Sequence, residues 1–176
     1  MGKLVLHFRD KKSSTVGLEG CVFTNGCFDI LHRGHMELFR FCHRQKTIKS
    51  QRPVVVGVNS DKSIKELKGS TRPFIGEVDR TEVLVSIQWI DYVIVFDTKS
   101  VFPLIEALRP QVLVKGGNYN TKPCAVADQI VGQEFVESYG GKVMTAPYVE
   151  GISTTEIIRR IMVPIPEKNR LVKNGN

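Results

Sequence analysis

Short apolar runs rich in β-branched residues alternate with amphipathic stretches along most of this chain. The apolar runs are predicted strands, and they cover residues 21–25, 54–59, 92–96, 112–114 and 142–146. Apolar positions at helical spacing lie between them and predict helices over residues 34–43, 63–68, 78–87, 101–108, 126–139 and 153–162. Asp61 is the expected N-cap of the second helix, which Gly69 closes. The alternation predicts a single α/β domain with a five-stranded, doubly wound parallel sheet flanked by helices.

Composition divides the chain into three parts. Residues 20–163 hold the alternating pattern and form the predicted domain, between a basic N-terminal extension at 1–19 and a polar C-terminal tail at 164–176. No apolar run approaches the roughly 20 residues of a membrane helix, and the first residues do not resemble a secretory signal. The four cysteines have neither metal-ligand spacing nor the density of a disulfide scaffold. We therefore expect a cytoplasmic protein without a membrane partner.

The net charge of +7 is concentrated in three segments. Residues 1–15 and 164–176 carry +3 and +2, residues 38–52 carry +5 without an acidic side chain, and the rest of the chain carries −3. A basic surplus fits nucleic acid, a membrane surface or an anionic substrate. Because the 38–52 patch closely follows a candidate phosphate site at 24–35, we expect its anion to be a small molecule.

The candidate phosphate site follows the first predicted strand. Ligands of open parallel sheets bind beyond the carboxyl ends of the strands, and Gly26 there permits close approach of the backbone to a phosphate. His32 and His35 lie three residues apart around Gly34 at a helix start, so both imidazoles are expected beside free backbone N–H groups. Two imidazoles in that position can stabilise charge that develops during phosphoryl transfer. A zinc site would need further ligands, and no other Cys or His has suitable spacing.

Two further segments follow later predicted strands. In KGGNY at 115–119, the glycines let backbone amides close on a ligand and Lys115 offers a positive charge for a phosphate, although glycine pairs are also ordinary turns. In EGISTTE at 150–156, Ser153 or Thr154 is the expected N-cap of a helix. Its hydroxyl serves either as a cap alone or as a further phosphate ligand.

Together these motifs resemble the cytidylyltransferase-like nucleotidyltransferases, through the HxGH box at 32–35 and GISTTEII at 151–158. The segments at 56–73 and 113–119 are most similar to the heptose-1-phosphate adenylyltransferase branch, often the C-terminal half of a bifunctional ADP-heptose synthase. The resemblance implies a Rossmann-like fold and transfer of AMP from ATP, with Mg²⁺, to a sugar 1-phosphate such as D-glycero-D-manno-heptose 1-phosphate. The products would be an ADP-sugar and pyrophosphate. It also implies a homodimer or higher homo-oligomer, and we expect a separate kinase to supply the substrate.

Motif position in this family implies a role for each site residue. The implied catalytic residues are His32, His35 and Lys115. The implied nucleotide-binding residues are Thr24, Asn25, Gly26, Phe28, Asp29, Gly34, Lys115, Gly116, Gly117, Asn118, Ser153, Thr154 and Thr155. The implied substrate-binding residues are Asn59, Asp61 and Arg72, with Asn59 and Asp61 near the acceptor or the nucleotide. No resident metal ligand is expected, and no covalent enzyme intermediate, because the acceptor phosphate is itself the nucleophile.

Two departures from the family pattern affect these expectations. Related cytidylyltransferases carry RTEGISTT, whereas this chain has Tyr148-Val149 before EGISTT. The missing arginine removes a bidentate phosphate ligand and favours ATP over CTP. The segment at 45–51 is also longer and more basic than the turn expected there. We expect one of Arg44 and Lys46 to reach the triphosphate, with Lys46 as the catalytic candidate. In the alternative, the segment is a solvated helix end and neither residue acts on the triphosphate.

Two alternatives stay open. A cytidylyltransferase acting on glycerol 3-phosphate or a similar phosphate monoester would share the HxGH box. A nucleic-acid-binding module would use the 38–52 patch and the tails, but the sequence contains no DNA- or RNA-binding motif. We expect ATP and a sugar phosphate as the partners, and not nucleic acid.

Overall fold

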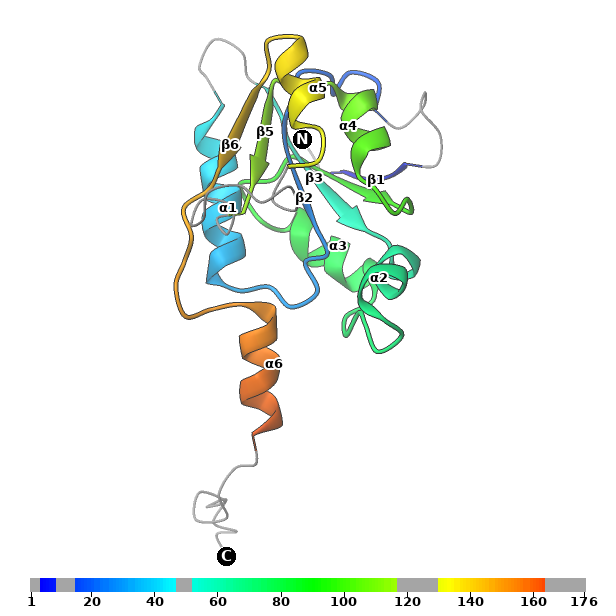
Figure 1. Cartoon of the computed structure of the whole chain (residues 1–176), viewed down its shortest axis with the longest axis vertical. Coiled ribbons are helices and arrows are strands. Elements are labelled where there is room, and N and C mark those ends of the chain that lie inside the picture. Colours follow the sequence, from blue (N-terminus) through cyan, green and yellow to red (C-terminus); the bar gives the residue numbers. More distant parts are fainter. Residues whose placement is uncertain (1–3, 9–14, 47–51, 117–129, 164–176) are drawn as a thin grey trace, which may run out of the picture.

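The computed structural model describes residues 4–8, 15–46, 52–116 and 130–163, and six strands in these ranges form one parallel sheet (Figure 1). The strands are β1 (Leu4–Phe8), β2 (Val22–Gly26), β3 (Val54–Asn59), β4 (Tyr92–Phe96), β5 (Val112–Lys115) and β6 (Lys142–Thr145). The helices are α1 (Arg33–Arg44), α2 (Asp61–Lys68), α3 (Glu77–Val85), α4 (Phe102–Leu108), α5 (Gln133–Ser138) and α6 (Thr154–Met162). The predicted parallel α/β sheet is confirmed, with six strands in place of five.

The strand order β1-β4-β3-β2-β5-β6 makes β2 the point where the topology reverses. Val22 of β2 pairs with Val54 of β3 on one side and with Val112 of β5 on the other. The chain builds outward from β2 through β3 and β4, and then returns to the other side to add β5 and β6. In open α/β sheets such a reversal leaves a crevice at the carboxyl ends of the strands, which is where ligands bind.

Helices cover both faces of the sheet. Phe39 of α1 and Leu84 of α3 belong to the apolar cluster around Val56, on one face. Leu104 of α4 belongs to a second cluster around Phe23, to which α5 also contributes. All five side chains are fully buried. The strands therefore need apolar residues on both faces, which explains their continuous β-branched runs.

The sixth strand, β1, falls inside the predicted N-terminal extension. It pairs in parallel with β4 along its whole length, and its Phe8 is buried in the sheet core. The pattern missed it because a five-residue apolar segment flanked by charges carries little periodicity. The basic residues of the extension and the polar tail at 164–176 lie outside the described ranges.

Two helix boundaries differ from those expected. Ser60, and not Asp61, is the N-cap of α2, because its Oγ accepts a hydrogen bond from the backbone N–H of Ser63 at 3.0 Å. Gly69 closes α2 as expected, with a φ of 93°. α5 begins only at Gln133, and residues 126–129 of the predicted helix lie outside the described residues.

The last helix, α6, extends away from the rest of the molecule (Figure 1). None of its residues is buried, and Ile161 and Met162 are 73% and 76% exposed. Within the described ranges, no helix combines the length and apolar character that a membrane crossing requires.

Candidate active site

The candidate site lies at the carboxyl ends of β2 and β5, on either side of the topological reversal. After Gly26 the chain enters a tight loop in which Phe28 adopts a φ of 48°, in the left-handed region. The Phe28 ring is buried against His35 and Phe39, with centroid distances of 5.3 and 5.2 Å. A Cβ atom on Gly26 would lie 3.1 Å from the same ring. The packing of one aromatic ring thus fixes the loop, and glycine at position 26 leaves room for it.

His32 caps the N-terminus of α1. Its Nδ1 accepts a hydrogen bond from the backbone N–H of Gly34 at 3.1 Å, so the neutral ring carries its proton on Nε2. A Cβ atom on Gly34 would lie 3.0 Å from the His32 ring, which accounts for the glycine in the HxGH box. The cap places Nε2–H of His32 at the end of α1 where the helix dipole is positive.

The two histidines of the box are in direct contact. Their rings stack with centroids 3.8 Å apart and planes 26° from parallel. Burial, followed by the charges of His32 and Lys68, lowers the pKa of His35 to about 3, and burial also lowers the pKa of His32. Both rings are therefore neutral at pH 7. The Nδ1 atom of His35 is buried and has no hydrogen-bond partner among the described residues.

Lys115 joins the site from β5. Its Nζ donates a hydrogen bond to Oδ1 of Asn25 on β2, which confirms that the first and second motif segments meet. Burial lowers the pKa of Lys115 to about 8. The adjacent Gly116 is exposed, whereas Gly117 and Asn118 lie outside the described residues.

Lys68 is a residue that the sequence motifs did not single out. It is the exposed last residue of α2, and its charge contributes, after burial and the charge of His32, to the lowered pKa of His35.

The third motif segment reaches the site at the start of α6. Ser153 is the N-cap and accepts a hydrogen bond from the backbone N–H of Glu156 at 3.0 Å. The Thr154 hydroxyl donates to the carbonyl oxygen of Ile30 at 3.4 Å, which ties α6 to the loop before His32. Thr155 is exposed.

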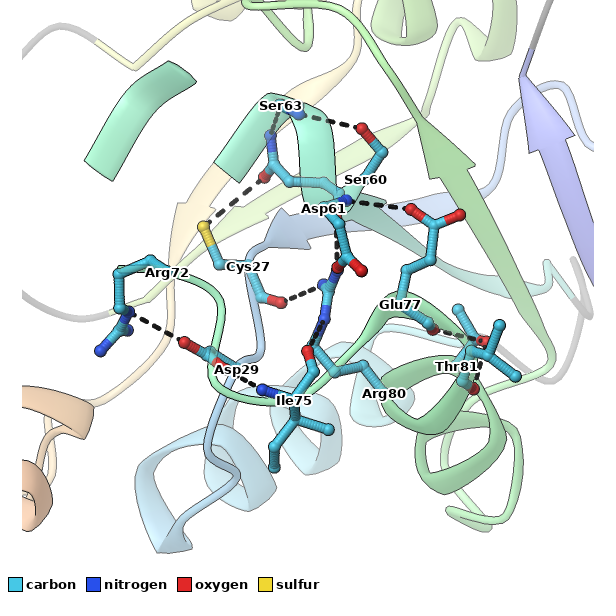
Figure 2. A network of polar contacts seen from close by, with 12 residues as sticks. Cys27, Asp29, Ser60, Asp61, Ser63, Arg72, Ile75, Glu77, Arg80 and Thr81 are labelled. Atoms are coloured by element: carbon cyan, nitrogen blue, oxygen red, sulfur yellow. Dashed lines mark hydrogen bonds and ion pairs between the residues drawn. The ribbon is translucent and has the colours of Figure 1, made fainter. Parts of the chain in front are cut away.

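The residues expected to bind the acceptor have partners within the protein (Figure 2). Nδ2 of Asn59 donates to Oγ of Ser63 at 2.8 Å, and Oδ1 of Asp61 accepts from Arg80 at 2.7 Å. Arg72 forms an ion pair with Asp29 at 2.9 Å. These internal contacts leave direct acceptor binding by the three side chains without geometric support.

Asp29 also differs from its expected role. Its side chain is 2% exposed, and Oδ1 accepts hydrogen bonds from the backbone N–H groups of Phe74 and Ile75 at 2.8 and 2.9 Å. It therefore anchors the segment before α3 to the loop after β2. Thr24 is fully buried in β2, and its Oγ1 has no hydrogen-bond partner among the described residues.

The structure does not bring Lys46 to the site. It lies beyond the C-terminal end of α1 and forms an ion pair with Asp91, whose carboxylate also accepts from the first residue of β3, Val54. The 12 residues of α1 separate this end from His32 by about 18 Å. Arg44 is the last residue of the same helix, so neither Arg44 nor Lys46 lies beside the histidines. The geometry does not support the catalytic role expected for Lys46, because α1 separates its C-terminal end from the histidines at its N-terminal end.

No group of three or more His, Cys, Asp or Glu side chains in the described ranges could hold a metal ion. A Mg²⁺ ion carried by a triphosphate needs no such group, because phosphate oxygens and water supply most of its six ligands. The site is therefore compatible with a metal that arrives with the nucleotide.

The sequence matches a known protein family and several curated relatives. The family model with the description Cytidylyltransferase-like matches residues 23–160, which contain every motif segment above. Among curated relatives named Bifunctional protein HldE, that of Geobacter sulfurreducens is 49% identical over 141 residues, covering 80% of this chain and 26% of the relative. That of Syntrophotalea carbinolica is 44% identical over 158 residues, covering 90% and 29%. The chain spans less than a third of the length of these relatives.

Solved structures share the architecture. A lipopolysaccharide core biosynthesis protein from Thermoplasma volcanium has a TM-score of 0.55 at 21% identity, covering 73% of this chain and 96% of that one. A macrolide-efflux protein from Streptococcus pneumoniae has a TM-score of 0.64 at 21% identity, covering 90% and 57%. Likeness at this level of identity shows the fold alone.

Proposed function

The chain is a nucleotidyltransferase of the cytidylyltransferase-like family, and from that premise we propose that it transfers AMP from ATP to a sugar 1-phosphate. The observation that carries the proposal is the stacked, neutral pair His32 and His35 at the start of α1, with Lys115 beside it at the topological reversal. The sequence resemblance and the relatives named HldE support D-glycero-D-manno-heptose 1-phosphate as the acceptor.

The start of α1 binds the triphosphate in this proposal. The positive end of the helix dipole attracts phosphate oxygens, whereas the backbone N–H groups of Gly34, His35 and Met36 already donate to His32. His32 donates from Nε2, and His35 presents its unpartnered Nδ1 as a further donor in the tautomer that protonates it. Lys68 and Lys115 neutralise part of the negative charge without requiring a charged imidazole.

The acceptor phosphate is the nucleophile. One of its oxygens attacks the α-phosphorus of ATP, a new P–O bond forms, and the bond from the α-phosphorus to the bridging oxygen breaks to release pyrophosphate. Charge grows on the leaving pyrophosphate, where the imidazole N–H groups and the two lysines stabilise it. Catalysis thus rests on in-line positioning and neutralised charge. Mg²⁺ bound to the triphosphate supplies additional charge neutralisation.

The nucleotide preference rests on the segment before α6. Tyr148 and Val149 stand where related cytidylyltransferases have Arg-Thr, and Tyr148 is 51% exposed. The bidentate arginine contact of the cytidylyl enzymes has no counterpart at that position. The family description nevertheless keeps CTP as the second candidate nucleotide. The HxGH box that such enzymes share keeps glycerol 3-phosphate as its candidate acceptor.

Pyrophosphate release measured over a panel of acceptors tests the proposal. ATP and CTP are each combined with heptose 1-phosphate, other sugar 1-phosphates and glycerol 3-phosphate. We expect the highest kcat/KM for ATP with a sugar 1-phosphate. Turnover with CTP and glycerol 3-phosphate, but not with ATP, would overturn the proposal and establish the second candidate.

The same resemblance supports two coarser proposals. We place the enzyme in the cytoplasm as a homodimer or higher homo-oligomer. Analytical ultracentrifugation tests the second point, and a monomer at micromolar concentration would contradict it.

A further inference from the structure

Arg80 of α3 is a fully buried cation next to the site. Its side chain is 1% exposed, and it is one of the largest fully buried side chains of the described protein. Burying a guanidinium is unfavourable unless its N–H groups are paired. The hydrogen-bond partners of the Arg80 guanidinium therefore indicate which parts of the chain it holds in place.

Four hydrogen bonds satisfy the guanidinium (Figure 2). Nε donates to the carbonyl oxygen of Ile75 at 2.9 Å, and Nη1 donates to that of Cys27 at 2.6 Å. Nη2 donates to the carbonyl oxygen of Asn59 at 2.9 Å and to Oδ1 of Asp61 at 2.7 Å. Three of the four acceptors are backbone carbonyls, so Arg80 fixes the path of the main chain.

These acceptors belong to three separate segments of the chain. Cys27 opens the loop that leads to His32, and the Asn59–Asp61 segment starts α2, which ends at Lys68. Ile75 belongs to the segment that Asp29 also binds through its backbone. The three segments belong to different parts of the fold, and the Arg80 guanidinium donates a hydrogen bond to each of them.

We propose that Arg80 is a positioning residue that sets the loop of the histidine pair against the start of α2. Its effect on turnover rests on the proposed function, whereas its effect on the two segments does not. Lysine keeps the charge but has three donors on one nitrogen, so it cannot reproduce a planar fork that reaches three segments. If Arg80 only stabilised the fold, its replacement by lysine would lower the free energy of unfolding and leave turnover unchanged.

Two control variants separate these roles. Arg109→Lys makes the same substitution at a residue that stacks on Tyr139 with its guanidinium 4.4 Å from the ring centroid, and that ends α4 outside the site. Ile105→Val shortens a fully buried side chain of α4 and should cost about 0.5–1.5 kcal/mol of stability. Both should keep the kcat of the unmodified protein.

Arg80→Lys is the test variant, and kcat, the KM for ATP and backbone amide exchange are measured on the full chain. We expect kcat to fall by about tenfold or more, which corresponds to about 1.4 kcal/mol of transition-state stabilisation. Amide exchange should become faster at 27–31 and 59–63 but not in β4. A kcat within twofold of both controls, or unchanged exchange at these two segments, would overturn the proposal.

Two further results are informative. If Arg80→Lys does not fold, Asp61→Asn replaces it and weakens only the carboxylate contact; unchanged exchange at 59–63, the segment that this contact holds, would then overturn the proposal. If the unmodified chain transfers no nucleotide, the proposed function fails, and the exchange measurement still decides the role of Arg80.

Discussion

The imidazole rings of His32 and His35 stack at a centroid distance of 3.8 Å at the start of α1. Stacking at this distance is incompatible with a charge on both rings in the absence of an anion, and the lowered pKa values of both residues agree with that. The pair is therefore neutral, and under the proposed function it would donate hydrogen bonds to phosphates while lysines supply the positive charge.

His35→Ala should lower kcat by about 10²–10³-fold, because a preorganised donor acts on charge that develops in the transition state. The fold should persist, since the ring lies at the crevice and not in either core cluster. Circular dichroism and kcat are measured together. His43→Ala, at an exposed position in the last turn of the same helix, is the matched control. A folded His35→Ala variant with near-normal kcat would show that the box is not catalytic.

The stability of the protein should fall as the pH decreases from 7 to 5. The pKa of His35 is about 3 in the folded chain, against an ordinary value of 6.5, so below about pH 6.5 the unfolded chain binds a proton that the folded chain does not. The free energy of unfolding then decreases by up to about 1.4 kcal/mol per pH unit for this residue. Urea unfolding at pH 7, 6 and 5 measures the slope. His35→Asn should flatten it, and equal slopes in both proteins would contradict the low pKa.

Lys115 should produce an alkaline limb in the pH profile of kcat/KM for ATP. Burial lowers its pKa to about 8, and above that pH the free enzyme loses the ammonium that we propose to neutralise the triphosphate. Since kcat/KM reports the ionisation of the free enzyme, the limb should appear near pH 8. Lys115→Arg should move the limb beyond the measured range, because guanidinium stays protonated. A limb that stays in place in this variant would exclude Lys115 as its source.

Gly34→Ala should impair activity with little loss of stability. Alanine favours the helix by up to about 1 kcal/mol over glycine, but its Cβ would press on the His32 ring at 3.0 Å. We therefore expect kcat to fall through displacement of His32. A double-mutant cycle checks this route: Gly34→Ala should add little to the loss already caused by His32→Ala. Additive losses would mean that Gly34 acts independently.

Much of the fold was predictable because its signal is local. The β-branched runs at 54–59 and 92–96 coincide with β3 and β4, and Gly69 ends α2 as expected. Local pattern also placed His32 and His35 together at a helix start. β1 was missed because the sheet partner that stabilises it, β4, lies far away in the sequence.

The residues that sequence reasoning misjudged depend on distant contacts. Lys46 is close to the HxGH box in the sequence, yet α1 carries it to the opposite end of the sheet. Arg80 belongs to no motif, and only the packing of α3 brings it to the loop after β2. Asp29 was expected to face the nucleotide, but the backbone N–H groups it binds lie about 45 residues later in the chain.

Isotope transfer from the acceptor phosphate tests the central claim most directly. Heptose 1-phosphate labelled with ¹⁸O in its phosphate is incubated with ATP and Mg²⁺, and the products are analysed by mass spectrometry. The proposed attack of the acceptor phosphate on the α-phosphorus predicts an ADP-sugar that retains all of the label and pyrophosphate that contains none. Unlabelled AMP with intact acceptor, or label in the pyrophosphate, would contradict it.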